Sequence, residues 1–565
     1  MGQKNAAPKR ITTEDRGLQA VRSRTQERMG NVSVSGRYHR LPKRMEDDYV
    51  ILKSVLGTGY NGEVLMAECK HTKGKFAVKG FKLHGVSKDK MQDLETEAEI
   101  FLSMDHPHVA RLVDVYESDS QLQLVMECMT GGELFERVSE KKRFNEKDAA
   151  EAAYQMLLAV NYLHSHNIVH RDIKLENFLY EAKESDQLKM IDFGFSKVWA
   201  PNTTMANSCG TLAYVAPEVL DGSYTSQCDI WSLGVVVFIL LFGYMPFGGS
   251  EAKQIHDIHN GKYGYKKVYW DRVSAVAQDF VRKMLVVDQS KRLTAAQALE
   301  HEWLMTREHH STAVDQAVVD ALCNFGKAST FRRACLGVMA WSLSSEERQA
   351  VREAFLELDS NHTGAITLQE FKQALEDTFH INCTEVEKAF QALDVSHHDE
   401  IHYTEFLAAM VSSRIALHDD LLKDTFRRFD VDNSGFITPD NLREVLGETM
   451  EGCAVEQLME EADFKHDGRI SYEEWIVYLR GSSADQTHTD AANLVIDKHV
   501  ETEDRKRGKG KKLTLRAGPG IQGGMHSSPA LIVFSDRKVE EILLEGVLVE
   551  QEEIAIDSQL KTPQK

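Results

Sequence analysis

Hydrophobic and polar positions alternate with two different periods along the chain. Short apolar runs that end at glycine or at a charged residue predict β-strands at residues 49–56 and 76–79. Apolar positions three and four residues apart predict amphipathic helices at residues 88–104, 351–358 and 421–429. The longest apolar run, residues 233–242, is shorter than the roughly 20 residues that cross a bilayer, so we expect a buried core helix there.

The second half of the chain contains a repeat. Aspartates recur at steps of 35, 36 and 33 residues, and each opens a twelve-residue segment with isoleucine at its eighth position. The four segments are residues 359–370, 394–405, 430–441 and 463–474. A period of this length indicates a repeated structural unit, and the order helix, loop, helix is that of EF-hands in two pairs.

The length and the composition fit a division into domains. A chain of 565 residues exceeds what one hydrophobic core usually serves, so we expect two to four domains. With 42% hydrophobic and 27% charged residues, the chain is neither disordered nor membrane-like as a whole. The eight cysteines lie far apart, without a CxxC pair or a preceding secretory signal, which predicts reduced thiols in an intracellular protein.

The net charge of −20 is distributed unevenly. Residues 344–480 contain thirty acidic and twelve basic side chains, a net charge of −18, whereas residues 1–44 contain eleven basic and three acidic ones, a net charge of +8. We expect the N-terminal stretch to be a disordered basic arm. It lacks the interleaved aromatic residues of a nucleic-acid-binding segment, so we expect no nucleic-acid partner. Membrane contact stays open, although Ala6 stands where an N-myristoylation motif has Ser or Thr.

Five separated motifs carry the candidate chemistry of the first half. The pattern GxGxxGxV at residues 57–64 lets backbone amides fold over phosphate groups, although a hairpin without a ligand has the same pattern. Lys79 interrupts an apolar strand and needs an anionic partner, for which Glu97 and Glu99 on the following helix are candidates. The other three motifs are HRDxKxxN at residues 170–177, DFG at residues 192–194 and APE at residues 216–218.

This set of motifs resembles the eukaryotic protein kinases over residues 49–304. The resemblance includes DxWSxG at residues 229–234, which braces the catalytic loop in that family, and Arg292, whose counterpart pairs with the glutamate of APE. It implies a bilobal α+β protein kinase fold at residues 45–305. The repeats then form a second, all-α domain of the EF-hand (calmodulin-like) class.

The resemblance also implies roles in phosphoryl transfer, which needs positioning and charge neutralisation more than covalent chemistry by the protein. The catalytic residues implied are Lys79, Glu97, Asp172, Lys174, Asn177 and Asp192. Lys79, fixed by Glu97, would hold the α- and β-phosphates of ATP. Asn177 and Asp192 would bind Mg²⁺ through oxygen atoms. Asp172 would accept the proton of the substrate hydroxyl, and Lys174, the residue of serine/threonine kinases at this place, would steady the γ-phosphate.

A nucleotide cleft follows from the same resemblance. Its lining would comprise Leu56, Gly57, Thr58, Gly59, Gly62, Val64, Ala77, Lys79, Met126, Glu127, Met129 and Glu133. Met126 holds the gatekeeper position, and the backbone of Glu127 and Met129 would bind adenine. Glu133 and Glu176 match acidic positions that face basic residues upstream of the acceptor in basophilic kinases. Two solvated glutamates are the alternative.

The first two EF-hand loops differ in quality. The first has a complete ligand set, Asp359, Asn361, Thr363, the carbonyl of Ala365, Thr367 and a bidentate Glu370. We expect it to bind Ca²⁺. The second has His398 at the fifth position and Asp399 where glycine permits the sharp bend, so we expect it to be structural only.

The third and fourth loops are each damaged at one position. The third ends in Asn441 in place of the bidentate glutamate, and the fourth has Lys465 at its third position, where a cation opposes Ca²⁺ unless it swings outward. Their remaining candidate ligands are Asp430, Asp432 and Ser434 in the third loop, and Asp463, Asp467, the carbonyl of Arg469 and Glu474 in the fourth. We expect affinity to fall from the first loop to the third and fourth together, and then to the second.

A basic amphipathic pattern lies between the two halves, at residues 317–343, with Lys327, Arg332 and Arg333 among apolar positions. Such helices dock in the apolar grooves that EF-hand pairs open on binding Ca²⁺, although an ordinary surface helix is the alternative. The order kinase, basic helix, four EF-hands resembles the calcium-dependent protein kinases of plants and protists. That resemblance implies an autoinhibitory junction helix at residues 311–343, which occludes the substrate cleft at low Ca²⁺ and is withdrawn when the EF-hands of residues 344–480 fill.

We therefore predict a Ca²⁺-regulated serine/threonine kinase that uses ATP and Mg²⁺ and phosphorylates proteins with basic residues upstream of the acceptor. Two alternatives stay open. One is a kinase whose EF-hands are only a scaffold, because three loops are flawed, and the other is a Ca²⁺-binding scaffold without catalysis. We expect a cytoplasmic location, with the basic arm open to peripheral membrane contact, and a mostly disordered extension at residues 481–565.

Overall fold

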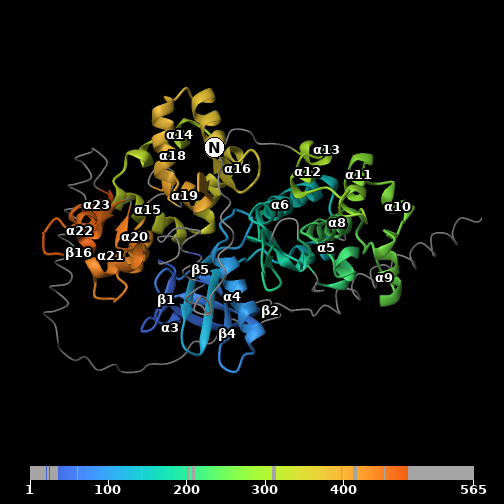
Figure 1. Ribbon diagram of the computed structural model, residues 1–565, viewed down its shortest axis with the longest axis horizontal. Helices are drawn as coiled ribbons and strands as arrows, with labels where there is room; N and C mark the ends of the chain where they lie inside the picture. The colour runs from blue at the N-terminus through green and yellow to red at the C-terminus, as the bar shows by residue number, and fades with distance from the viewer. Residues whose placement is uncertain are drawn as a thin grey trace, which may run out of the picture.

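The computed structural model describes residues 36–59, 62–141, 143–199, 203–205, 210–307, 314–395, 398–411, 417–450 and 452–480, together with Val21 and Thr25. The predicted C-terminal extension and most of the predicted basic arm lie outside these residues. Two large hydrophobic cores organise the described chain, one in the kinase half and one shared by the junction and the EF-hands. Figure 1 shows the kinase half at the lower centre and right, and the EF-hand domain at the left and top.

The small lobe is a six-stranded sheet, in the order β1-β5-β6-β4-β3-β2, with one long helix beside it. Its elements are β1 (Tyr38–Arg40), α3 (Met45–Asp48), β2 (Tyr49–Gly59), β3 (Gly62–Cys69), β4 (Lys75–Lys82), α4 (Lys88–Leu102), β5 (Leu112–Glu117) and β6 (Gln121–Glu127). The predicted strands and helix are confirmed. Antiparallel pairing sets Val64 opposite Lys79 and Ala77 opposite Met126, so cleft residues from separate segments lie side by side.

The end of the predicted basic arm is ordered, which corrects the expectation of disorder through residue 44. Tyr38–Arg40 forms a strand that pairs in parallel with β5. Arg37 is buried, and its guanidinium donates to the main-chain oxygens of Leu112 and Leu102 at 2.7 and 3.3 Å. Two contacts order this segment: main-chain pairing at the edge of the sheet and the hydrogen bonds of the buried guanidinium. The excess of basic residues in the sequence does not predict either contact.

The large lobe is mostly helical. Its elements are α5 (Leu134–Lys141), α6 (Glu146–Ser165), β7 (Ile168–Val169), η1 (Leu175–Asn177), β8 (Phe178–Tyr180), β9 (Leu188–Met190), β10 (Lys197–Val198), η2 (Leu212–Tyr214), α7 (Pro217–Leu220), α8 (Gln227–Phe242), α9 (Glu251–His259), α10 (Lys267–Trp270), α11 (Ala275–Met284), α12 (Ala295–Leu299) and α13 (Glu302–Met305). The apolar run at residues 233–242 lies in α8 and is buried, as predicted. None of the helices in the described part of the chain has both the length and the apolarity to span a bilayer.

The junction forms two helices, α14 (Gln316–Lys327) and α15 (Thr330–Ser342), which corrects the expectation of one helix over residues 311–343. Ala328 is extended, and the side chain of Ser329 caps α15 by accepting a hydrogen bond from the amide of Arg332. The apolar faces of both helices belong to the EF-hand core. The structure therefore places the junction among the EF-hands, and residues 311–313 lie outside the described chain.

The EF-hand domain consists of two pairs of loops with their helices. Its elements are α16 (Ser345–Leu358), β11 (Ala365–Thr367), α17 (Leu368–Lys372), the π-helical η3 (Gln373–Thr378), α18 (Cys383–Leu393), β12 (Glu400–His402), α19 (Tyr403–Met410), α20 (Asp419–Phe429), β13 (Phe436–Ile437), α21 (Pro439–Leu446), β14 (Thr449–Met450), β15 (Cys453–Ala454), α22 (Val455–Glu460), β16 (Ile470–Ser471) and α23 (Tyr472–Arg480). The isoleucines at the eighth loop positions lie opposite each other, Ile366 with Ile401 and Ile437 with Ile470. The predicted pairing of loops is confirmed.

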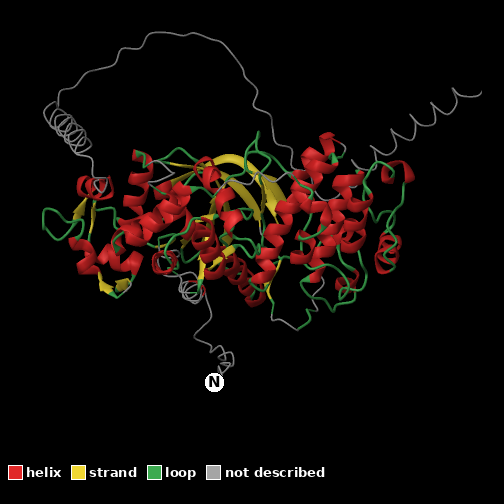
Figure 2. Ribbon diagram, turned by 90° about the horizontal axis from the view of Figure 1, so that it is seen from above, coloured by secondary structure: helices red, strands yellow, loops and turns green. Residues whose placement is uncertain are grey.

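The described helices and strands form one continuous, elongated body in Figure 2, and buried polar contacts join the EF-hand domain to the kinase half within it. Thr404 of α19 donates from its amide and its hydroxyl to Asp105 at 2.7 and 2.8 Å. Arg428 of α20 pairs with Asp114 of β5 at 2.8 Å. All four side chains are buried, so the contact is a specific polar interface shielded from water.

Candidate functional site

Lys79 joins the two lobes of the kinase half. Its Nζ lies 2.6 Å from Oε1 of Glu97 on α4 and 3.0 Å from Oδ1 of Asp192. Burial lowers the pKa of Lys79, but the two carboxylates outweigh burial and raise the pKa above its ordinary value. The ammonium group is therefore charged, and the structure pairs it with Glu97, the partner that the kinase resemblance implies.

Asp172 is the centre of the catalytic loop. Its Oδ2 lies 3.1 Å from Nζ of Lys174, and Asn177 donates from Nδ2 to its main-chain oxygen at 2.7 Å. The hydroxyl of Thr211 donates to Oδ1 of Asp172 at 3.3 Å and accepts from Lys174 at 3.4 Å. These contacts bring three predicted residues together and hold the carboxylate in one orientation.

Thr211 is a site residue that the sequence reasoning missed. It follows Gly210, whose φ is +99° and where a Cβ would lie 2.8 Å from the main-chain oxygen of Arg171. Only glycine fits this close approach between the activation segment and the catalytic loop. The Gly-Thr pair before the APE motif is the signal that can locate such a contact.

Asp229 braces the catalytic loop and Arg292 braces the APE motif, as the kinase resemblance implies. Asp229 on α8 accepts hydrogen bonds from the amides of His170 and Arg171 at 2.9 and 2.8 Å. Arg292 binds Glu218 of the APE motif through both Nη atoms, at 2.6 and 3.0 Å. A bidentate, buried pair of this kind fixes geometry as well as charge.

Asp192 and Asn177 fit the predicted Mg²⁺ site. The amide of Ile191 donates to the main-chain oxygen of Asn177 at 2.9 Å, which sets Asp192 beside the catalytic loop. Burial raises the pKa of Asp192, but Lys79 outweighs it and the pKa falls below its ordinary value. Asn177 donates through Nδ2 to Asp172, which turns its amide oxygen toward other partners. A charged carboxylate and an amide oxygen are ligands that Mg²⁺ accepts.

The glycine-rich hairpin covers the edge of the predicted nucleotide cleft. Gly57, Thr58 and Gly59 end β2 after Leu56, and Gly62 begins β3; residues 60 and 61 lie outside the described chain. A Cβ on Gly57 would meet no atom within 4 Å, and Gly62 has a φ of +128° that favours glycine. The hairpin therefore has the open backbone that an ATP phosphate chain requires.

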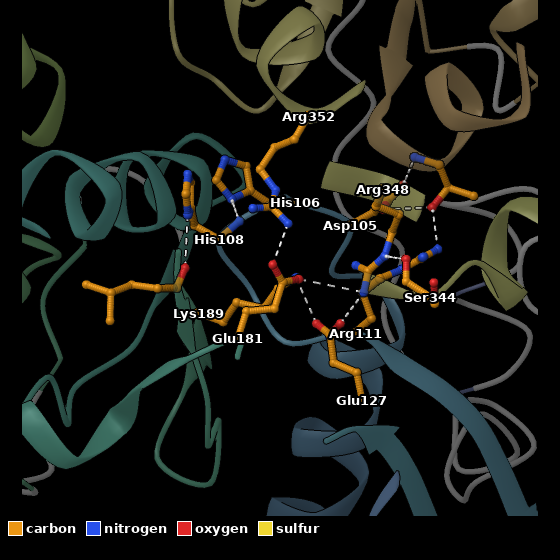
Figure 3. Close-up of polar contacts among 12 residues, drawn as sticks. Asp105, His106, His108, Arg111, Glu127, Glu181, Lys189, Ser344, Arg348 and Arg352 are labelled. Atoms are coloured by element: carbon orange, nitrogen blue, oxygen red, sulfur yellow. Dashed lines mark hydrogen bonds and ion pairs between the residues drawn. The ribbon is translucent and has the colours of Figure 1, made fainter. Parts of the chain in front are cut away.

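Glu127 follows the gatekeeper Met126, and its carboxylate has a role that the sequence reasoning missed. Its Oε1 lies 2.9 Å from Nζ of Lys189 and accepts the amide of Arg111 at 2.7 Å, while Oε2 lies 2.5 Å from Nη2 of Arg348 (Figure 3). Burial raises the pKa of Glu127, but Arg348 and Lys189 lower it well below its ordinary range. An EF-hand helix thus contacts the hinge that begins at Glu127.

Glu133 lies near Glu136 and Glu176. Burial, followed by the charges of these two glutamates, raises the pKa of Glu133 to about 7. A carboxyl group in this state gains from an added cation, which fits the predicted recognition of basic residues. Met129 lies in the same hinge segment, four residues before Glu133.

The first EF-hand loop is arranged for a cation. Asp359 accepts the amides of Thr363 and Gly364 at 3.0 and 2.8 Å, and Glu370 accepts those of Asn361 and Thr367 at 2.8 and 2.9 Å. Burial and the charge of Glu370 raise the pKa of Asp359 to about 7. Two buried carboxylates in a ring of amide, hydroxyl and carbonyl oxygens, which includes the carbonyl of Ala365, fit Ca²⁺.

The second and third loops keep the backbone conformation of an EF-hand loop, although residues at the glycine or ligand positions differ from those of the first loop. Asp399 has a φ of +61°, the left-handed conformation that glycine adopts at this position, so the predicted strain is present. In the third loop, Asp430 accepts the amide of Ser434 at 2.9 Å, beside Asp432. Asn441 accepts the amide of Thr438 at 3.0 Å, as glutamate does in the first loop, but it carries no charge.

The fourth loop contains its own cation. Nζ of Lys465 lies 3.2 Å from Oγ of Ser471 and 3.7 Å from Oε2 of Glu474. The lysine side chain is 59% exposed, but its ammonium group lies beside the glutamate that would bind Ca²⁺. Asp463 accepts the amide of Gly468 at 2.9 Å, so the loop keeps its turn. Asp467 pairs with the side chain of Arg469 at 3.2 Å.

Known proteins share this arrangement. The protein kinase domain model matches residues 50–304, and the EF-hand domain pair model matches residues 348–411 and 419–478. "Calcium-dependent protein kinase 34" of Arabidopsis thaliana is 35% identical over 456 residues, which cover 79% of this chain and 87% of that protein. "Calcium-dependent protein kinase 11" of Oryza sativa subsp. japonica is 35% identical over 449 residues, 78% of each chain.

The fold and the site define an enzyme, a protein kinase that carries EF-hands in the same chain. The comparisons identify the family more closely. The chain belongs to the calcium-dependent protein kinases, and it is a calcium-regulated serine/threonine protein kinase. A kinase domain implies ATP and Mg²⁺, and EF-hands imply Ca²⁺.

Proposed function

We propose that this enzyme transfers the γ-phosphoryl group of ATP to serine or threonine through the residues assembled around Lys79 and Asp172. When bound, ATP would supply the phosphoryl group and Mg²⁺ would neutralise the charge of its phosphates. Lys79, charged and held by Glu97 at 2.6 Å, neutralises phosphate oxygens. Asp172 takes the hydroxyl proton at its carboxylate, and Lys174, 3.1 Å away, stabilises the charge that develops nearby. The Lys79 ion pairs carry this proposal most directly, because they connect both lobes in one geometry.

The cleft selects substrates with basic residues upstream of the acceptor. Glu133, with a pKa of about 7, lies close to Glu136 and Glu176, and an arginine of the substrate would stabilise the charged form of this group. Protein substrates are implied by the kinase domain itself. The glutamates at and around Glu133 support the more specific proposal that these substrates carry basic residues upstream of the acceptor.

Calcium acts by moving the junction between two sites. In the structure, α14 and α15 pack on the EF-hand helices α18, α19 and α20. The same segment carries Lys327, Arg332 and Arg333, which are complementary to the acidic substrate cleft. We infer that the junction occupies the cleft at low Ca²⁺ and returns to the EF-hand core when the first loop binds Ca²⁺. The cytoplasmic location stays a prediction from the cysteine pattern.

Phosphorylation of a basic peptide across a Ca²⁺ titration tests this function. We expect activity that rises with Ca²⁺ and collapses when a chelator is added. Asp172→Asn should reduce transfer by about a thousandfold or more while Ca²⁺ binding is retained, because it removes the proton acceptor. Equal activity with and without chelator would show that the EF-hands act only as a scaffold. Replacing the upstream arginine of the peptide by alanine should raise its KM, and an unchanged KM would exclude the role of Glu133.

A further inference from the structure

Two arginines of the EF-hand helix α16 reach the kinase hinge. Nη2 of Arg348 lies 2.5 Å from Oε2 of Glu127, and Nη2 of Arg352 lies 2.6 Å from Oε2 of Glu181. The arginines are four residues apart, so they project from one face of the helix (Figure 3). Their side chains are only 3% and 2% exposed, which shields both ion pairs from water and salt.

The two glutamates stand at opposite ends of the hinge. Glu127 ends β6 and begins the hinge. Glu181 follows β8, and its main-chain oxygen accepts the amide of Thr130, at the far end of the hinge, at 3.1 Å. Helix α16 therefore contacts the start of the hinge through Arg348, which also lies 4.0 Å from Glu181, and contacts Glu181, the residue that binds the end of the hinge, through Arg352.

The kinase half alone does not balance these charges. Lys189 lies between the glutamates, with Nζ 2.9 Å from Glu127 and 3.7 Å from Glu181. One lysine against two carboxylates leaves a net charge of −1 in this buried group, and the two arginines change it to +1. Burial lowers the pKa of Lys189 to about 8, and the arginines act in the same direction. The docked EF-hand domain therefore supplies two of the cations around the hinge, beside Lys189 and Arg111 of the kinase half.

We propose that Arg348 and Arg352 are positioning residues of the nucleotide site, which couple the calcium-bound EF-hand domain to ATP affinity. The inference rests on the proposed function, since it requires that Ca²⁺ favours this docked arrangement and that the hinge holds adenine. Coupling between two binding sites is reciprocal. Calcium must then tighten nucleotide binding by the same factor by which the nucleotide tightens calcium binding.

Calorimetric binding of a non-hydrolysable ATP analogue with Mg²⁺ to the full chain tests this coupling. We expect the Kd to be about tenfold lower with Ca²⁺ than with chelator, within the usual range of such couplings. Arg348→Ala should reduce that ratio to below about twofold. Arg443→Ala is the matched control, because Arg443 pairs with Asp440 and Glu456 inside the EF-hand domain, and it should keep the full ratio.

Conservative variants protect the test from misfolding. Arg348→Lys keeps a charge without the guanidinium and should give an intermediate ratio, and Arg352→Gln removes the second contact. If circular dichroism shows that Arg348→Ala is unfolded, the Kd ratios of Arg348→Lys and Arg352→Gln test the coupling instead. A nucleotide Kd that does not depend on Ca²⁺ in the unsubstituted protein, or a full ratio in both folded arginine variants, overturns the inference.

Peptide phosphorylation separates this inference from the proposed function. Activity that depends on Ca²⁺ together with a nucleotide Kd that does not would overturn the coupling alone. Phosphorylation that is independent of Ca²⁺ would overturn the calcium switch, whatever the binding data show.

Discussion

The first and fourth EF-hand loops have the same backbone and different electrostatics. In each loop the amide of the sixth-position glycine donates to the first aspartate, at 2.8 Å in the first loop and 2.9 Å in the fourth. Each ends in a buried glutamate. In the fourth loop, however, Nζ of Lys465 lies 3.7 Å from Glu474, whereas in the first loop burial and then the neighbouring carboxylate of Glu370 raise the pKa of Asp359 to about 7.

This difference shows that the EF-hand fold and the need for Ca²⁺ are separable. A main-chain hydrogen-bond pattern and paired isoleucines are enough to build the loop. Whether the carboxylates then require a bound ion depends on the charges inside the loop. The fourth loop has an internal ammonium group, and the first has none among the described contacts of its two carboxylates.

Removing the first loop's bidentate ligand should have the largest effect. Glu370→Gln takes away a charged Ca²⁺ ligand. We expect the Ca²⁺ concentration for half-maximal peptide phosphorylation to rise by about a hundredfold, or activation to disappear. Glu474→Gln in the fourth loop is the control, and it should change this half-maximal Ca²⁺ concentration by less than threefold. Equal effects of the two variants would contradict the comparison.

The second-largest effect should come from lowering the pH, which should weaken Ca²⁺ binding by the first loop. The raised pKa of Asp359, about 7, means that the carboxyl group is protonated below pH 7 in the metal-free protein, and Ca²⁺ must displace that proton. Calcium affinity should therefore fall by up to about tenfold per unit as pH drops below 7. The same shift means that stability of the metal-free protein, measured by thermal unfolding, decreases as pH rises through 7. A flat Ca²⁺ affinity between pH 6 and 8 would exclude this effect.

Replacing the internal cation should create a site in the fourth loop. Lys465→Asp restores an acidic ligand at the third position and removes the ammonium group beside Glu474. Calorimetry should then detect about one more Ca²⁺ per chain than in the unsubstituted protein. Lys423→Asp on α20 adds the same charge outside the loops and should leave the count unchanged. No added ion in the first variant would show that Lys465 is not what keeps this loop closed to calcium.

The smallest effect is expected in the second loop. Asp399→Gly removes the backbone strain of a non-glycine residue with a φ of +61°. It also increases the conformational entropy of the unfolded chain, which opposes this gain. We expect a net gain in the free energy of unfolding below about 1 kcal/mol, measured by urea denaturation with Ca²⁺ present. Asp399→Ala, which cannot adopt this conformation easily, should destabilise the protein instead. A loss of stability with glycine would mean that the aspartate side chain is needed for the turn.

Motif spacing predicted much of the site. The kinase resemblance implied the pairing of Lys79 with Glu97 and the braces at Asp229 and Arg292, and the repeat predicted the pairing of the EF-hand loops; all of these appear in the structure. Thr211 and Arg348 were not predicted. Each acts on a partner far away in the chain, and only packing brings the two together.

By itself, the sequence determined the order of a kinase domain followed by EF-hands, the positions of the kinase motifs and the differences in side-chain type among the EF-hand loops, because each depends on local spacing and on residue identity. The tertiary structure decided where the charges meet. It divided the junction at Ser329, ordered the strand after Arg37, set the ammonium group of Lys465 beside Ser471 and set Arg348 against Glu127. These outcomes depend on burial and on partners distant in the chain, which no local pattern specifies.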